Sequence, residues 1–304
     1  MLSRQFSQKL LYLGLGEMGH HMAGFFSKQF DCTVWNRTYA KTERHAELFK
    51  TKGLSGNNPF AHDVSDIDLI FTCFPTSVEV ELFADLLIKT DPRRKKDVVW
   101  VDNTSGVPSH SEKIAEKLEK VNVGFIDAPV SGGRAGASSG KLAVMVGGKE
   151  KYFQKAEPVL KTISKSLIHI DEKVGSGHAV KGYNNLLYGC NILLAMKIAQ
   201  SLEAHNINLD KSLKTIMNAS GGSASMVRVH EYAVNNRKID YNFKTSHLVK
   251  DMRIGLSQIE GGEKDILNPL FRKIIDVYSE GAKQNWNDHD LFEIYSFIEN
   301  KPKI

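Results

Sequence analysis

The chain has 304 residues, 41% hydrophobic and 25% charged, so it is long enough for two domains and is neither a disordered segment nor a small disulfide scaffold. Its 40 Lys and Arg against 35 Asp and Glu give a formal net charge of +5, an excess too small to indicate a nucleic-acid or membrane partner. Cys32, Cys73 and Cys190 form no CxxC pair and have no neighbouring His at metal-ligand spacing. We therefore expect three reduced, buried, structural cysteines and no metal site.

The ends and apolar runs of the chain bear on its location. The longest uncharged apolar runs fall short of the roughly 20 residues that a membrane span needs, so we predict no membrane segment. Residues 1–7 carry one Arg, two Ser and no acid, a faint likeness to a mitochondrial presequence. Because the first strand is predicted to start by Leu10, too little chain precedes it for an amphipathic presequence. We expect a cytoplasmic location, with a mitochondrial one as the alternative.

From residue 10 to about residue 170, short apolar runs alternate with longer stretches of helical spacing. This alternation is typical of repeated βα units and predicts an α/β domain with a Rossmann-type, doubly wound, mainly parallel sheet. Between the first two strands, Met18, Met22, Phe25 and Phe26 form the apolar stripe of a helix that packs on a sheet. The predicted strands are residues 10–13, 32–35, 69–73, 98–101, 124–126, 142–146 and 167–169.

After Gly177 the strand pattern stops. Residues 178–204 contain no Pro and are rich in Leu, Ala, Ile and Met, so they predict one long, largely buried helix. The rest, through residue 298, has mostly helical spacing broken by residues 221–222, 261–262 and 269. We predict a dinucleotide-binding domain over residues 1–172 and an all-α domain for substrate binding and oligomerisation over residues 173–304. The charge run at residues 93–96 predicts a solvated turn.

Gly14, Gly16 and Gly19 form a GxGxxG string directly after the first predicted strand and at the start of a helix. In this context the first glycine permits a tight turn and the second lets the backbone approach a pyrophosphate. The third allows close contact between helix and strand. The N–H groups at the start of the helix then face the phosphates. The motif in this place predicts dinucleotide binding.

The second predicted strand ends at Trp35 and is followed by Asn36, Arg37 and Thr38. An NAD site usually carries an acid here, which binds the ribose 2′-hydroxyl. That acid would repel a 2′-phosphate, whereas Arg37 and Thr38 can donate hydrogen bonds to one. We therefore predict NADP(H) over NAD(H). The alternative is that Arg37 is an exposed turn residue and Thr38 caps the next helix, which is compatible with either cofactor.

Lys181, Asn184 and Asn185 stand at i, i+3 and i+4 near the start of the long predicted helix, so they share one face. The helix continues with apolar residues, and burial of a Lys and two amides there is costly unless they serve a polar ligand. The alternative is that Lys181 extends to solvent and the asparagines cap neighbouring backbone.

Two further segments carry polar groups. The string DAPVSGG at residues 127–133 predicts a glycine-rich loop between two strands, and its hydroxyl and backbone N–H groups can hold an anion. The alternative is a flexible connection. Residues 243–251 place a cation and an acid, Lys250 and Asp251, on a predicted helix, and by themselves these indicate a surface ion pair.

The chain resembles the β-hydroxyacid dehydrogenases, which include 3-hydroxyisobutyrate dehydrogenase and the glyoxylate and succinic semialdehyde reductases. Four sequence motifs that occur in the same order as in this family carry the resemblance. They are GLGEMGHHM at residues 14–22, DAPVSGG at residues 127–133, GSGHAVKGYNN at residues 175–185 and KDM at residues 250–252. Together they cover nearly the whole chain, and their joint occurrence is more specific than any one of them. VWNRT at residues 34–38 is similar to the NADP-dependent reductase branch of the family.

The resemblance implies roles for substrate-binding residues. It implies that Lys181 is the catalytic lysine, that Asn185 helps to orient the substrate, and that Phe243 and Asp251 line its pocket. The substrate carboxylate is implied to be held by Ser131, Gly132 and Gly133.

On the cofactor side, the resemblance places Lys250 near the cofactor and Ser105 where the family commonly has a threonine beside the nicotinamide. Ser105 retains the hydroxyl and opens a methyl-sized space, which leaves the choice of substrate open. The residues that we assign to the cofactor site are Gly14, Leu15, Gly16, Glu17, Met18, Gly19, Asn36, Arg37, Thr38, Phe74, Pro75, Ser105 and Lys250.

The combined hypothesis is a hydride transfer from NADPH to a short acidic aldehyde or keto acid, similar to glyoxylate or succinic semialdehyde, with the Lys181 ammonium as proton donor. A free lysine has a pKa near 10.4, so the acid form that reduction needs is already present at neutral pH. Oxidation needs the neutral amine, about three pKa units away, which costs roughly 4 kcal/mol. Alternatives are NAD-dependent 3-hydroxyisobutyrate oxidation, imine reduction and a non-catalytic NADP-binding module. We expect a small-molecule carboxylate substrate and a homodimer or homotetramer.

Overall fold

The computed structural model describes residues 8–91, 97–235, 237, 243–259, 265–283 and 290–299. The chain divides into two compact units, Met1–Lys181 (unit 1) and Gly182–Ile304 (unit 2). The predictions for residues 1–7, 93–96 and 261–262 lie outside the described residues. Within the described ranges, no helix is long and apolar enough to cross a membrane.

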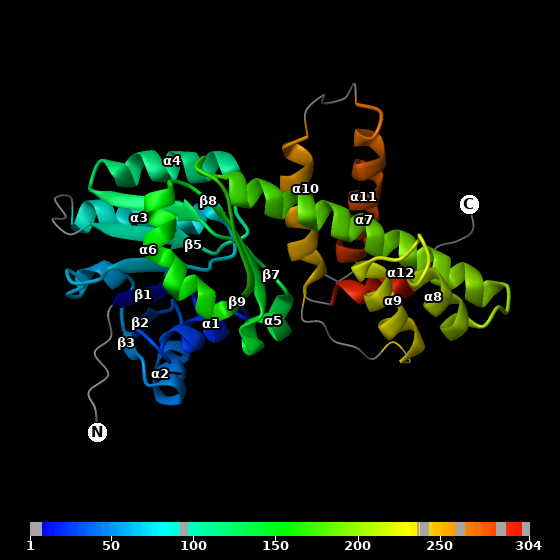
Figure 1. Ribbon diagram of the computed structural model, residues 1–304, viewed down its shortest axis with the longest axis horizontal. Helices are drawn as coiled ribbons and strands as arrows, with labels where there is room; N and C mark the ends of the chain where they lie inside the picture. The colour runs from blue at the N-terminus through cyan, green and yellow to red at the C-terminus, as the bar shows by residue number, and fades with distance from the viewer. Residues whose placement is uncertain are drawn as a thin grey trace. The chain divides into compact units, whose positions relative to one another are not determined.

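Unit 1 is built on one sheet (Figure 1). Its described strands follow the order β3-β2-β1-β4-β5-β6-β8-β7, with β9 paired to β8. Strands β1 to β6 run parallel, whereas β8 is antiparallel to β6 and β7. The predicted doubly wound, mainly parallel sheet is confirmed. The strands are β1 Lys9–Leu13, β2 Asp31–Trp35, β3 Lys52–Leu54, β4 Leu69–Thr72, β5 Val98–Asp102, β6 Val123–Asp127, β7 Val130–Ser131, β8 Leu142–Gly147 and β9 Ser164–Asp171.

Helices pack on both faces of this sheet because alternate residues of each buried strand face opposite sides. Leu10 and Tyr12 belong to the core shared with α1, α5 and α6. Leu11 and Leu13 belong to the core shared with α3 and α4. The helices of unit 1 are α1 Gly19–Phe26, α2 Tyr39–Phe49, η1 Pro59–Ala61, α3 Ser77–Thr90, α4 Pro108–Glu119, α5 Gly133–Ser139, α6 Glu150–Leu160 and η2 Lys161–Ile163.

The strand order reverses between β1 and β4, since β2 and β3 lie on one side of β1 while β4 and β5 lie on the other. Loops that leave the carboxyl ends of two such strands diverge and open a crevice, which is where doubly wound folds bind ligands. Here these are the loop after β1, with its three glycines, and the loop after β4, with Phe74 and Pro75.

Three sequence-based expectations for unit 1 need correction. The string DAPVSGG is not only a loop, because Val130 and Ser131 pair with β8 as the short strand β7 and Gly133 begins α5. Strand β3 was not predicted, because three residues with a central glycine give no hydrophobic period. Cys32 and Cys190 are buried as expected, but Cys73 is only partly buried because it lies in the loop after β4.

Unit 2 contains the rest of α7, which begins in unit 1, and further helices around their own core (Figure 1). The predicted all-α carboxy-terminal part is confirmed. The long helix is also confirmed, but it is less buried than expected because Leu187, Leu194 and Ile198 are exposed. The elements are α7 Ser176–Ala204, α8 Leu209–Met217, α9 Ala224–Val234, α10 Thr245–Ser257, α11 Asn268–Lys283, η5 Leu291–Glu293 and α12 Ile294–Glu299.

Candidate active site

Each of the three motif glycines in the loop after β1 is a glycine for a different physical reason. Gly14 has φ +101°, and a Cβ there would lie 2.5 Å from the Cys73 carbonyl oxygen. A Cβ at Gly19, where α1 begins, would lie 2.0 Å from the Gly14 carbonyl oxygen. At Gly16, by contrast, no atom of the described residues beyond its two chain neighbours lies within 4 Å of the Cβ position. The fold itself requires the first and third glycines, and the open space at the second fits a pyrophosphate at the start of α1.

Asn36 ties the loop after β2 to the glycine loop. Its Oδ1 accepts a hydrogen bond from the Leu15 backbone N–H at 3.0 Å, and its Nδ2 donates to the Thr38 carbonyl at 3.2 Å. Arg37 and Thr38 are exposed beside it. Thr38 occupies the N-cap position of α2, but its hydroxyl makes no capping hydrogen bond. The alternative that Thr38 serves as a side-chain cap is therefore wrong.

The loops after β4 and β5 are joined beside the glycine loop. The Phe74 backbone N–H donates to the Thr104 hydroxyl at 3.1 Å, and the Thr104 backbone N–H donates to Asp102 Oδ1 at 3.0 Å. Ser105 follows directly and is half-buried, whereas Pro75 is exposed. The assigned cofactor residues of unit 1 thus come from the carboxyl ends of four neighbouring parallel strands, β1, β2, β4 and β5.

The proposed carboxylate loop follows β7. Ser131 is half-buried, and Gly132 and Gly133 are exposed with φ +135° and +61°, conformations that favour glycine. Arg134 lies next to them, with its Nη1 3.6 Å from Glu17 Oε2 of the glycine loop. This exposed ion pair brings the glycine loop and the DAPVSGG segment to one region of unit 1.

Asp127, at the end of β6, anchors the start of the helix that carries Lys181. Its Oδ1 accepts from the Gly175 backbone N–H at 2.6 Å, and its Oδ2 accepts from that of His178 at 2.7 Å. Burial raises the pKa of this carboxyl above its ordinary value, although the two backbone N–H donors act in the opposite direction. Sequence reasoning gave Asp127 no role, although an acid at a strand end is a common partner for a helix amino terminus.

Lys181 lies one turn after His178, and 8% of its surface is exposed. The alternative that its side chain extends to solvent therefore does not fit. A buried ammonium is costly unless polar groups or a ligand face it. The burial of Lys181 supports a functional lysine.

Asn185, one turn further along α7, is held by α10 within unit 2. Its Nδ2 donates to Asp251 Oδ2 at 2.6 Å, and its Oδ1 accepts from Asn184 Nδ2 at 2.9 Å. The two helices approach closely at a pair of glycines, since a Cβ at Gly255 would lie 2.3 Å from the Gly182 carbonyl oxygen. Structure therefore brings Asn185 and Asp251 together although 66 residues separate them in sequence.

Two expectations for the segment 243–251 need correction. Asp251 Oδ1 lies 3.1 Å from Lys250 Nζ, but Asp251 is only 4% exposed, so this is not the surface ion pair that the residues alone indicated. Phe243 is not on the helix, because α10 begins at Thr245. The Phe243 backbone instead bonds to the start of η5, donating to Asp290 Oδ2 at 3.2 Å and accepting from the Leu291 N–H at 2.9 Å.

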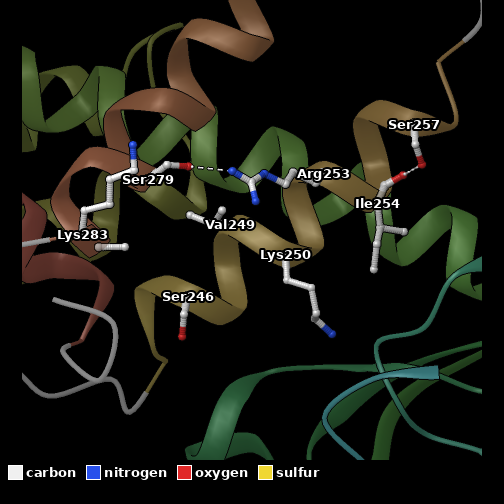
Figure 2. Close-up of a pocket in the computed structure, with 9 residues that line it drawn as sticks. Ser246, Val249, Lys250, Arg253, Ile254, Ser257, Ser279 and Lys283 are labelled. Carbon is white, nitrogen blue, oxygen red and sulfur yellow. Dashed lines mark hydrogen bonds between the residues drawn. The ribbon is translucent and has the colours of Figure 1, made fainter. Parts of the chain in front are cut away.

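Lys250 lines a cavity of about 560 Å³ in unit 2, formed by α10 and α11 (Figure 2). Across it, Arg253 donates to the Ser279 hydroxyl at 3.2 Å. Three cations and no acid are among the described residues that line it, so its walls favour an anionic ligand. The lining residues are Ser246, Val249, Lys250, Arg253, Ile254, Ser257, Ser279, Ala282 and Lys283.

Comparison with known proteins gives the family. The NAD-binding domain of 6-phosphogluconate dehydrogenase matches residues 9–171, and the family described as NAD-binding of NADP-dependent 3-hydroxyisobutyrate dehydrogenase matches residues 175–298. The mitochondrial 3-hydroxyisobutyrate dehydrogenase of Mus musculus is 32% identical over 302 residues, with 94% of this chain and 86% of the relative covered. The chain belongs to the β-hydroxyacid dehydrogenase family.

Other relatives of this β-hydroxyacid dehydrogenase agree in fold and chemistry. A 2-(hydroxymethyl)glutarate dehydrogenase of Eubacterium barkeri is 30% identical over 286 residues, covering 94% of this chain and 93% of the relative. A 3-hydroxyisobutyrate dehydrogenase structure from Mycobacterium tuberculosis superposes with a TM-score of 0.83 at 21% identity, over 96% and 99% of the two chains. The resemblance seen in the sequence is confirmed, and the chain is an NAD(P)-dependent oxidoreductase that acts on CH–OH groups.

Proposed function

We propose that this β-hydroxyacid dehydrogenase reduces a short acidic aldehyde or keto acid, of the glyoxylate or succinic semialdehyde type, with NADPH. The observation that carries this proposal is Lys181, a buried cation one helical turn before Asn185 on α7. We assign cofactor binding to residues 1–172 and substrate binding and oligomerisation to residues 173–304. We expect a cytoplasmic location and no nucleic-acid partner.

The loop after β2 supports the choice of NADPH. Asn36 is neutral, and its amide is occupied by hydrogen bonds to the Leu15 and Thr38 backbone. Arg37 is exposed and, within the described ranges, forms no ion pair, while the Thr38 hydroxyl does not cap α2. A guanidinium and a hydroxyl at this place suit the doubly charged 2′-phosphate, and no carboxylate repels it.

Lys181 acts as the general acid in this proposal. NADPH, when bound, supplies the hydride. The Lys181 ammonium, which is the acid form of the side chain, donates a proton to the alkoxide oxygen that develops on the substrate. The Asp127 carboxylate fixes the start of α7 through two backbone hydrogen bonds, so the lysine is carried on a rigid element.

Polar groups orient the substrate. Asp251 Oδ2 can only accept, so the atom of Asn185 that faces it is the donor Nδ2, and the orientation of the amide is fixed. Asn185 then presents its other Nδ2 hydrogen. Ser131, with the N–H groups of Gly132 and Gly133, holds the substrate carboxylate, and Phe243 lines the pocket.

The exposed face of α7 supports an oligomer. Tyr183, Leu187, Leu194 and Ile198 stand at spacings of 4, 7 and 4 residues, so they form one stripe, and they are 42%, 61%, 57% and 46% exposed. An apolar stripe of this kind is unusual on the surface of a monomer. We propose that a homodimer or homotetramer covers it.

The test is the loss of NADPH absorbance, and in parallel of NADH absorbance, when purified protein meets glyoxylate or succinic semialdehyde. Faster turnover with NADPH supports both the cofactor choice and the reductase assignment. Faster turnover with NADH contradicts the cofactor choice and favours the second candidate, oxidation of 3-hydroxyisobutyrate, for which the mouse relative is named. If NADPH binds and neither aldehyde is turned over, the proposed substrate class is wrong.

A further inference from the structure

The His178 side chain is enclosed by elements that border the candidate active site of unit 1. Its Nδ1 lies 2.8 Å from the Ser111 hydroxyl of α4, and its Nε2 lies 3.9 Å from Asp102 Oδ2 at the end of β5. A Cβ at Gly106 would lie 2.7 Å from Cε1 of the ring, so the ring rests against the backbone there. The Ser111, His178 and Asp127 set is not a hydrolase triad, because all three are at most 1% exposed.

The partners determine where the ring carries its proton. A carboxylate only accepts hydrogen bonds, so Nε2, which faces Asp102, carries a hydrogen, and Nδ1 accepts from the Ser111 hydroxyl. Within the described ranges, Nε2 and Asp102 Oδ2 are both buried without a hydrogen-bond partner. The second carboxylate that faces the ring, Asp127 Oδ2, lies 4.0 Å from Nδ1 and already accepts from the His178 backbone.

A buried donor and acceptor that face each other without contact cost free energy, and such groups are rare in native folds, so this pair calls for an explanation. Asp102 Oδ1 holds the Thr104 backbone N–H at 3.0 Å, directly before Ser105. His178 therefore lies between the loop 104–106 and the first turns of α7. Lys181 follows three residues later on the same helix.

We infer that His178 is a positioning residue for the dehydrogenase reaction: its buried ring holds the turn of α7 that carries Lys181 against the loop 104–106. The inference rests on the proposed role of Lys181. Without the ring, the space between α7 and the residues Gly106 and Ser111 is no longer filled. The start of α7 can then move toward these residues. A displacement of about 1 Å at a reacting group lowers turnover by about 100-fold.

The test compares His178→Ala, His178→Gln and Ser111→Ala with the unsubstituted chain, and uses His45→Ala as a matched loss of a buried histidine in unit 1. The readouts are kcat, KM for the aldehyde, the dissociation constant of NADPH from its fluorescence, and the free energy of unfolding. Nitrogen NMR of the His178 ring in the cofactor-free protein reports its tautomer without any turnover.

We expect His178→Ala to lower kcat about 30- to 100-fold while KM and NADPH affinity change less than about threefold. His178→Gln, whose amide reaches the position of Nε2, recovers about tenfold of this loss, and Ser111→Ala, which keeps the ring, costs about tenfold. His45→Ala leaves kcat unchanged. The ring is expected as the Nε2–H tautomer.

The inference is overturned if His178→Ala and Ser111→Ala keep the kcat of the unsubstituted chain, or if the ring is the Nδ1–H tautomer. The inference is also overturned if the kcat of His178→Gln is as low as that of His178→Ala and His45→Ala lowers kcat by the same factor. Lys181→Ala, measured in parallel, separates the two proposals. If Lys181→Ala turns over normally, the proposed function fails. If Lys181→Ala is inactive while His178→Ala turns over normally, only the positioning role fails.

Discussion

Substitution of Gly16 by alanine separates what the fold needs from what the cofactor needs. Apart from the two chain neighbours of Gly16, no atom in the described part of the chain lies within 4 Å of the Cβ that alanine adds, and the backbone at Gly16 is not in the positive-φ region. The change therefore removes only flexibility from the unfolded chain, and we expect it to raise the free energy of unfolding by about 0.4 to 1 kcal/mol or to leave it unchanged. The added methyl group instead occupies the space into which the pyrophosphate fits, and we expect NADPH affinity to fall by about 10- to 100-fold, or roughly 1.4 to 2.8 kcal/mol.

Gly14→Ala is the matched control because it places the same methyl group against the protein itself. Gly14 has φ +101°, and the new Cβ would lie 2.5 Å from the Cys73 carbonyl oxygen. Backbone strain of about 1 to 2 kcal/mol and overpacking of about 1 to 3 kcal/mol predict a loss of about 2 to 5 kcal/mol in the free energy of unfolding. Urea denaturation and NADPH fluorescence titration measure both quantities. A Gly16→Ala protein that is destabilised, or that binds NADPH as before, refutes the reasoning.

Three shorter predictions follow from other residues. Arg37→Ala is expected to raise KM for NADPH about 10- to 100-fold and to leave KM for NADH unchanged, since only the former carries the 2′-phosphate; equal effects in steady-state kinetics would contradict the assignment. Burial lowers the pKa of His45 from 6.5 to about 4, so between these pH values only the unfolded chain binds a proton. The free energy of unfolding therefore decreases as the pH is lowered through this range, by up to about 1.4 kcal/mol per pH unit. Urea denaturation from pH 7 to 4.5 measures this slope, and His45→Gln should flatten it; an unchanged slope counts against it. Leu194→Glu should shift the sedimentation of the protein toward the monomer, whereas an unchanged mass would show that this face of α7 is not the interface.

The strands were predicted well where burial is on both faces of a parallel sheet. A run such as that of β4, Leu69–Thr72, is buried throughout and begins with three apolar residues that follow a polar segment, so its position can be predicted from composition. Strand β9, Ser164–Asp171, was predicted too short because polar residues alternate along it at the sheet edge. The two-residue β7 exists only because β8 pairs with it, which no local pattern signals.

In the candidate site, too, the features that follow from local sequence patterns could be predicted, whereas those that depend on long-range contacts could not. The glycine loop and the helix face with Lys181 and Asn185 are local patterns, and the sequence predicts them without tertiary information. The contacts of Asp127 with the start of α7 and of Asn185 with Asp251 join residues 48 to 66 positions apart. Such contacts depend on strand order and helix crossing, which spacing does not determine. The burial of Asp251 and the enclosure of His178 were missed for this reason.

The most direct test of the account is turnover by Lys181→Ala under saturating NADPH and aldehyde, together with the affinity of this variant for NADPH. The account predicts that kcat falls by about 100- to 10,000-fold, the usual contribution of a general acid, while the dissociation constant of NADPH stays within about threefold. A Lys181→Ala protein with the turnover of the unsubstituted chain would contradict the assignment of Lys181 as the proton donor.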